Sequence, residues 1–124
     1  MSVIIRDDGF HDEDYLGEAV IDIAHDTKPE AMPGDFTGVE LVRVGFPGFS
    51  DGRGFTLARL VRAKGYKGRL RAVGPIIADQ YAMARRSGFD EVEIPDDLAA
   101  RQPADQWIFR ADWQEHDYRS RLKA

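Results

Sequence analysis

A repeated alternation of two patterns between residues 39 and 94 restricts the fold more than any other feature of this sequence. Three short apolar stretches, Val39–Val44, Leu70–Val73 and Glu91–Ile94, predict strands. In the third, acids alternate with apolar residues, as at the edge of a sheet. Strand, helix, strand, helix and strand with short connections favour parallel pairing through right-handed crossovers. The sequence therefore predicts an α/β domain with a parallel sheet built from consecutive βαβ units.

Two amphipathic stretches lie between these predicted strands. Phe55–Lys64 and residues 77–87 carry apolar side chains at helical spacing. Gly65 and Gly88 stand where each helix should end, because glycine is the usual residue just past a helix C-terminus. We therefore expect two helices that pack on the sheet.

The flanking regions are less regular. We treat residues 1–124 as a single domain with a core at about 39–94, an N-terminal extension at 1–38 and a C-terminal helical tail at 95–124. In the extension, Val3–Ile5 predicts an edge strand and Ala19–Ile23 a weaker strand. Thr27–Gly38 contains prolines and a glycine and predicts a flexible surface loop.

The C-terminal tail is helical in composition, and Pro103 is expected to begin a second helix there. Several aromatic side chains follow. We expect them to cover the core, since aromatic residues are often buried within their own chain. The alternative is a self-association surface that forms a homodimer. The aromatic residues concerned are Trp107, Phe109, Trp113 and Tyr118.

Composition excludes several classes of protein. The net charge of −5 and the pI of about 5.1 argue against nucleic acid or an anionic membrane as partner. The absence of cysteine excludes disulfides, a CxxC redox centre, cysteine-ligated metals and a cysteine nucleophile. No apolar stretch approaches the ~20 residues that span a bilayer, and the first residues do not resemble a signal peptide. A cytoplasmic protein is the expectation.

The loop before the first predicted helix is the most informative motif. It follows a strand, and ligands of open α/β sheets bind beyond the carboxyl ends of strands. Gly52 and Gly54 would let the backbone approach an anion at the helix N-terminus, and Arg53 would bind it. The alternative is that Ser50 or Asp51 simply caps the helix while the glycines shape the turn.

The loop after the second predicted strand should emerge at the same edge of the sheet. Arg71 would line a crevice there, near enough to Arg53 to share one anion. A buried ion pair between Arg71 and Asp79 is an equally good alternative. The full set of predicted anion-binding residues is Ser50, Asp51, Gly52, Arg53, Gly54, Arg71, Gly74, Asp79 and Gln80.

No catalytic constellation, metal site or cofactor motif is evident. His11, His25 and His116 fit no metal-ligand spacing, and no Ser/His/Asp order or nucleophile elbow is present. The acidic segment Phe10–Asp14 lacks the pattern of a calcium loop and predicts a solvated loop. Basic residues gather between Arg53 and Arg86, which predicts one positive face.

An ordered series of motifs resembles the bacterial domain of unknown function 934 family, over about residues 39–94. The resemblance implies a role in assimilatory sulfate reduction. Members are described as oxidoreductases of sulfite reduction, chiefly because their genes accompany those of sulfite reductase and phosphoadenylyl-sulfate reductase. Pro75 and Ser87 depart from the family pattern, which has an acid and a cysteine in many members. The motifs are Phe49–Ala58, Leu60, Gly65-Tyr66, Gly68, Leu70–Gly74, Asp79-Gln80 and Gly88–Asp90.

Three functions follow as expectations. The first is an accessory protein of sulfate and sulfite reduction that binds a partner protein or a small anion; sulfite reductase and the sulfonucleotide reductase are the expected partners. The second is an oxidoreductase of sulfite reduction with a borrowed cofactor, whose anion site at the sheet edge uses Asp51, Arg53 and Arg71. The third is a scaffold domain without catalytic activity.

Overall fold

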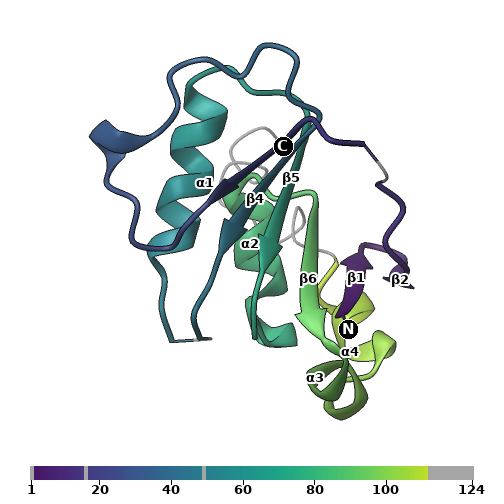
Figure 1. Ribbon diagram of the computed structural model, residues 1–124. Helices are drawn as coiled ribbons and strands as arrows, with labels where there is room; N and C mark the ends of the chain where they lie inside the picture. The colour runs from purple at the N-terminus through teal and green to yellow at the C-terminus, as the bar shows by residue number, and fades with distance from the viewer. Residues whose placement is uncertain (1, 16, 49, 112–124) are drawn as a thin grey trace, which may run out of the picture.

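The fold is built on a six-stranded sheet in the order β2-β1-β6-β5-β4-β3 (Figure 1). The computed structural model describes residues 2–15, 17–48 and 50–111. Helices and strands form one mixed α/β domain, as the sequence predicts. The strands are β1 (Ser2–Arg6), β2 (Gly9–His11), β3 (Val20–Ile23), β4 (Leu41–Gly45), β5 (Arg69–Val73) and β6 (Glu91–Pro95).

The strands β3, β4, β5 and β6 are parallel and follow one another in chain order across the sheet. The helix α1 (Arg53–Ala63) connects β4 to β5, and α2 (Tyr81–Ser87) connects β5 to β6. A short 3-10 helix, η2 (Ala78–Gln80), leads into α2. These are the predicted consecutive βαβ units, and α1 begins two residues before the predicted Phe55.

The N-terminal residues add an antiparallel hairpin to this parallel sheet. The strand β1 pairs with both β6 and β2, so β2 rather than Val3–Ile5 is the outermost N-terminal strand. The strand β6 lies between β5 and β1 and is not at an edge. The edge interpretation of β6 is wrong because its acids, Glu91 and Glu93, face arginines instead of solvent.

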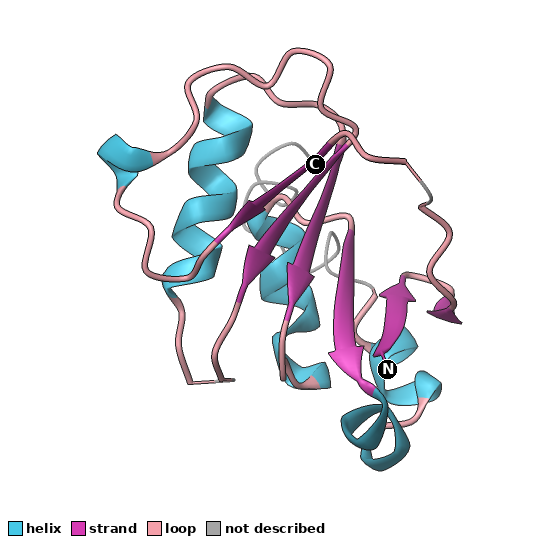
Figure 2. Ribbon diagram, viewed as in Figure 1, coloured by secondary structure: helices cyan, strands magenta, loops and turns pink. Residues whose placement is uncertain are grey.

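The two faces of the sheet differ in chemistry. One face packs on α1 and α2 through apolar residues such as Val44, Leu70 and Val92. Since successive residues of a strand point to opposite faces, the alternate positions form a second face. We call this second face the open face, because Figures 1 and 2 show no helix of the described residues in front of it. Charged residues dominate it, among them Arg43 and Arg71.

The connection between β3 and β4 is better packed than a flexible surface loop. It contains the 3-10 helix η1 (Pro29–Ala31). Met32 and Phe36 within it are buried in the core, and the Phe36 ring lies 5.4 Å from that of Tyr66. The prolines and glycine of this segment therefore shape a crossover that covers the sheet.

The C-terminal part forms α3 (Asp96–Arg101) and α4 (Ala104–Phe109), with Pro103 immediately before α4 as predicted. Trp107 is fully buried. Its ring meets Tyr81 edge-on at 5.9 Å, and its Nε1 donates a hydrogen bond to the Gln102 carbonyl at 2.9 Å. Trp107 therefore covers the core of its own chain. The same prediction is wrong for Phe109, whose side chain is exposed, and the predictions for Trp113 and Tyr118 lie outside the described residues. Over the described ranges, no helix is long and apolar enough to cross a membrane.

Candidate functional site

The two loops singled out by the sequence meet at the carboxyl edge of the parallel sheet. The backbone N–H of Phe46 donates to the Val73 carbonyl at 2.8 Å. This contact joins the loop after β4 to the end of β5, which are parallel neighbours. The prediction that both loops emerge at one edge is confirmed.

The glycines of these loops have a packing role around Phe46. A Cβ atom at Gly54 would collide with the Phe46 ring, and one at Gly74 would collide with the Phe46 carbonyl oxygen. Gly54 therefore lets α1 lie close to the buried Phe46 side chain, and Gly74 lets the two loops pass each other. Gly52 has only a distant contact with the Phe55 ring.

Asp51 binds the first residue of α1. Its Oδ1 accepts the backbone N–H of Arg53 at 3.0 Å, and its Oδ2 accepts from the Arg53 Nη2 at 2.5 Å. These hydrogen bonds from Arg53 lower the pKa of Asp51 to about 2. The carboxylate thus occupies the position predicted for an external anion, while Ser50 is exposed. The anion hypothesis for this loop stays a prediction, with Asp51 as a defined competitor.

An Arg53→Ala variant tests this competition. The Arg53 side chain is 58% exposed, so we expect the variant to melt within a few degrees of the wild type. Because Asp51 already holds the helix N-terminus, sulfate, sulfite or phosphate should raise the melting temperature of both proteins equally. Melting curves with each anion at matched ionic strength measure this. Stabilisation of the wild type alone would instead place an external anion on Arg53.

Arg71 lies away from this edge, on the open face of the sheet. Its side chain is fully buried. Nε donates to Glu91 Oε2 at 2.5 Å, and Nη1 donates to Glu13 at 2.6 Å and to Glu93 at 2.9 Å. The prediction that Arg53 and Arg71 share one anion is wrong, because Arg53 begins a helix on the opposite, helix-covered face.

Asp79 and Gln80 lie at the carboxyl edge, in the 3-10 helix η2 that leads into α2. Asp79 accepts from Arg110 Nη2 at 2.9 Å, so the alternative of a buried Arg71–Asp79 pair is also wrong. The side-chain oxygen of Gln80 accepts the Ile77 N–H at 3.2 Å. Both residues line a hollow of about 470 Å³ between α1 and α2, together with Gly52, Phe55, Thr56, Arg59 and Met83.

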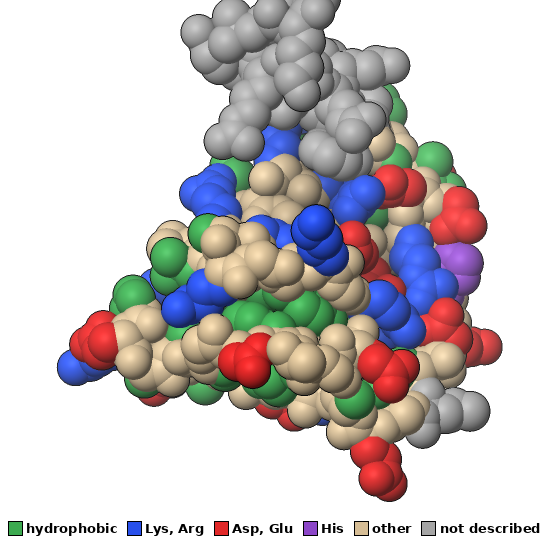
Figure 3. All heavy atoms as spheres, turned by 90° about the horizontal axis from the view of Figure 1, so that it is seen from above, with side chains coloured by type: hydrophobic (Ala, Val, Ile, Leu, Met, Phe, Trp, Pro, Cys, Tyr) green, Lys and Arg blue, Asp and Glu red, His purple; other side chains and the backbone are tan. Residues whose placement is uncertain are grey.

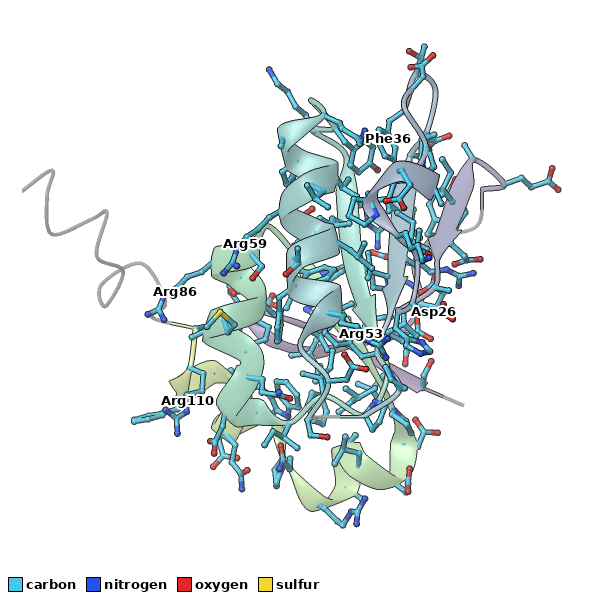
Figure 4. The ribbon with its side chains drawn as sticks, turned by 90° about the vertical axis from the view of Figure 1, so that its left-hand side faces the viewer. Asp26, Phe36, Arg53, Arg59, Arg86 and Arg110 are labelled. Carbon is cyan, nitrogen blue, oxygen red and sulfur yellow. The ribbon has the colours of Figure 1, made fainter. Side chains whose placement is uncertain are left out.

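A second hollow adjoins the first at Asp79. Its volume is about 370 Å³, and α4 contributes Phe109 and the following Arg110. Met83 is 43% exposed and Phe109 is 73% exposed, so both present apolar surface to solvent beside the hollows. We call the two hollows together the helix-layer groove. Figure 4 shows Arg59, Arg86 and Arg110 on the same side of the helical layer.

Sequence reasoning named part of this groove in other roles and missed the rest. Gly52, Asp79 and Gln80, which line it, were predicted as anion-binding residues, and that role stays a prediction. Phe109 was expected to cover the core or to form an association surface, and Met83 was missed. Both lie next to the buried stripe of their helix rather than in it. An apolar residue on the solvent side of a short helix is the signal that identifies them. Arg53 lines a separate hollow of about 360 Å³ with His25, Asp26 and Lys28.

The basic residues between Arg53 and Arg86 do not form the predicted positive face, because most of them are paired with acidic side chains. Arg62 donates to Asp90, Arg69 to Glu91, and Arg85 to Asp7. Figure 3, which looks onto the end of the domain where the parallel strands begin, shows basic and acidic side chains side by side. Within residues 2–15, 17–48 and 50–111, no group of three or more His, Cys, Asp or Glu residues is arranged to hold a metal ion.

Fold and site together define a small α/β domain with a parallel four-stranded core and an exposed, partly apolar groove in its helical layer. The chain belongs to the bacterial family of proteins of unknown function DUF934, whose model matches residues 20–121. No curated protein and no solved structure matches the chain.

Proposed function

We propose that this protein is an accessory factor of assimilatory sulfate and sulfite reduction that binds a protein partner through the helix-layer groove. The exposed apolar pair Met83 and Phe109 is the observation that supports binding. Interface centres are enriched in aromatic residues, methionine and arginine, and the groove has all three. The metabolic setting comes from the resemblance of the motifs to the sulfite-reduction family.

The groove has the shape and polarity of a docking surface. Phe55, Met83 and Phe109 supply apolar area around the shared Asp79. Arg110 at the rim is paired with Asp79, which leaves Arg59 as the guanidinium that favours an acidic group on the partner. Sulfite reductase and the sulfonucleotide reductase are the proposed partners.

A capture experiment with both purified reductases tests the proposal. We expect wild-type protein to bind one of them and a Met83→Ser/Phe109→Ser variant to lose at least about 30-fold in affinity, the effect of losing about 2 kcal/mol at a hot spot. The fold should be kept, since both side chains are exposed. Phe10→Ser is the matched control, because Phe10 is 36% exposed on β2 and lines neither hollow.

Growth of a deletion strain completes the test. The strain should grow slowly with sulfate and normally with a reduced sulfur source, and the groove variant should fail to restore growth on sulfate. Normal growth on sulfate, together with no capture of either reductase by the wild type, would overturn the proposal.

A further inference from the structure

A short acidic segment is held to the open face of the sheet by its side chains. We call residues 12–15 the acidic strap. Glu13 accepts from Arg71, and Asp14 accepts from Arg6 Nη2 at 2.8 Å and from Arg69 Nη2 at 2.9 Å. Among the described residues, no backbone hydrogen bond ties the strap to a strand. The strap is therefore held in place by its ion pairs and by a cation–π contact, in which the Arg69 guanidinium lies 5.8 Å from the centre of the Tyr15 ring.

Three arginines converge beneath the strap. Arg6 from β1 and Arg69 and Arg71 from β5 all donate to the buried carboxylate of Glu91, at 3.1, 2.9 and 2.5 Å. Arg71 is fully buried, and its Nη2 has no hydrogen-bond partner among the residues that the structure describes. A buried guanidinium N–H without an acceptor is costly. This cluster therefore has one more donor to offer than the described residues satisfy.

The charges of the cluster match a doubly charged ligand. The three arginines together with Glu91 and Glu93 have a net charge of +1. Including the two strap carboxylates, Glu13 and Asp14, makes the net charge −1. A dianion in place of Glu13 and Asp14 would leave the same total. These two side chains are 45% and 51% exposed, so a ligand reaches their positions from solvent.

We propose that Arg6, Arg69 and Arg71 form a binding site for a small divalent oxyanion of the sulfate and phosphate class, and that the acidic strap competes with this anion for the same donors. The oxygens of the anion would take the N–H groups now bound to Glu13 and Asp14, and one would reach the free Nη2 of Arg71. Guanidinium groups suit such oxygens because they donate in pairs from a rigid plane. This site lies on the open face and is independent of the helix-layer groove.

The test weakens the strap and keeps the arginines. In a Glu13→Gln/Asp14→Asn variant, sulfate should bind about tenfold or more tightly than in the wild type, because the competing state has lost its charge. Adding Arg69→Gln should abolish this gain. Calorimetric titration with sulfate and with phosphate, at ionic strength held constant with chloride, measures both. The control Asp12→Asn/Glu18→Gln removes the same charge from flanking positions that contact none of these arginines and should bind as the wild type does.

Two outcomes would overturn the site: a strap variant that binds sulfate no better than the control, or a gain that survives Arg69→Gln. Should the double variant not fold, the single variants Asp14→Asn and Asp12→Asn decide the matter. Asp14→Asn should bind sulfate more tightly than Asp12→Asn, because only Asp14 is bound to Arg6 and Arg69, and equal affinities would also contradict the proposal.

Discussion

Replacement of Gly74 by alanine is expected to lower the free energy of unfolding by about 3 kcal/mol or more, a large part of the total for a domain of this size. The new Cβ would collide with the backbone carbonyl oxygen of Phe46, and Phe46 is held in place because its N–H donates a hydrogen bond to the Val73 carbonyl. Gly74 also has a φ of 147°, which disfavours any L-residue. Urea unfolding followed by circular dichroism measures the change.

Gly38→Ala is the matched control for this prediction. Gly38 also has a positive φ, of 78°, but a Cβ there would meet no atom within 4 Å. The Gly38→Ala variant should therefore lose only about 1 kcal/mol of unfolding free energy, from backbone strain alone. Equal losses at Gly74 and Gly38 would show that the close approach of the two loops is not what requires glycine at Gly74.

Replacement of Arg71 by methionine is expected to be as damaging, with a loss of about 3 kcal/mol, because Glu93 loses its arginine and the buried Glu91 loses one of the three arginines that donate to it. Glu91 is only 2% exposed, and Glu93 17%. Arg43→Met is the control, since Arg43 is 37% exposed and its partner Asp22 is 66% exposed. A surface pair of this kind contributes at most about 1 kcal/mol. Equal losses for both variants would contradict the buried role of Arg71.

The difference in free energy of unfolding between the wild type and the Arg71→Met variant should also depend on pH. Burial alone would raise the pKa of Glu91, but hydrogen bonds and charge from Arg71 and Arg69 outweigh burial and hold that pKa below its usual value. A carboxyl group whose pKa is lower in the folded than in the unfolded state stabilises the fold at pH values above its unfolded-state pKa of about 4. This contribution is lost as the pH falls through the folded-state pKa. Chemical unfolding at several pH values should show the difference shrinking below about pH 4.

The central fold could be predicted because each of its elements is encoded locally. The β-branched stretch at Val39–Val44 and the helical spacing that ends at Gly88 do not depend on distant residues. The place of β1 between β2 and β6 could not be predicted, because it depends on which strand the hairpin joins. The acids of β6 resemble those of an edge strand until their partners on β1 and β5 are known.

The candidate site was predicted in part for a similar reason. Connectivity alone places Asp51 and Asp79 at one edge of the sheet. Arg71 was misplaced because the face that a strand residue occupies depends on the register of the strand. The strap carboxylate that binds Arg71 belongs to Glu13, which is 58 residues away in sequence, and no local pattern connects the two residues.

Hydrogen–deuterium exchange with and without the captured reductase tests the central claim, partner binding through the helix-layer groove, most directly. We predict slower exchange in the partner-bound protein at residues 52–59, 79–87 and 104–110, which carry the groove. Exchange at β3, on the far edge of the sheet, should not change. Protection at β3 or the acidic strap with none in the groove segments would contradict the claim.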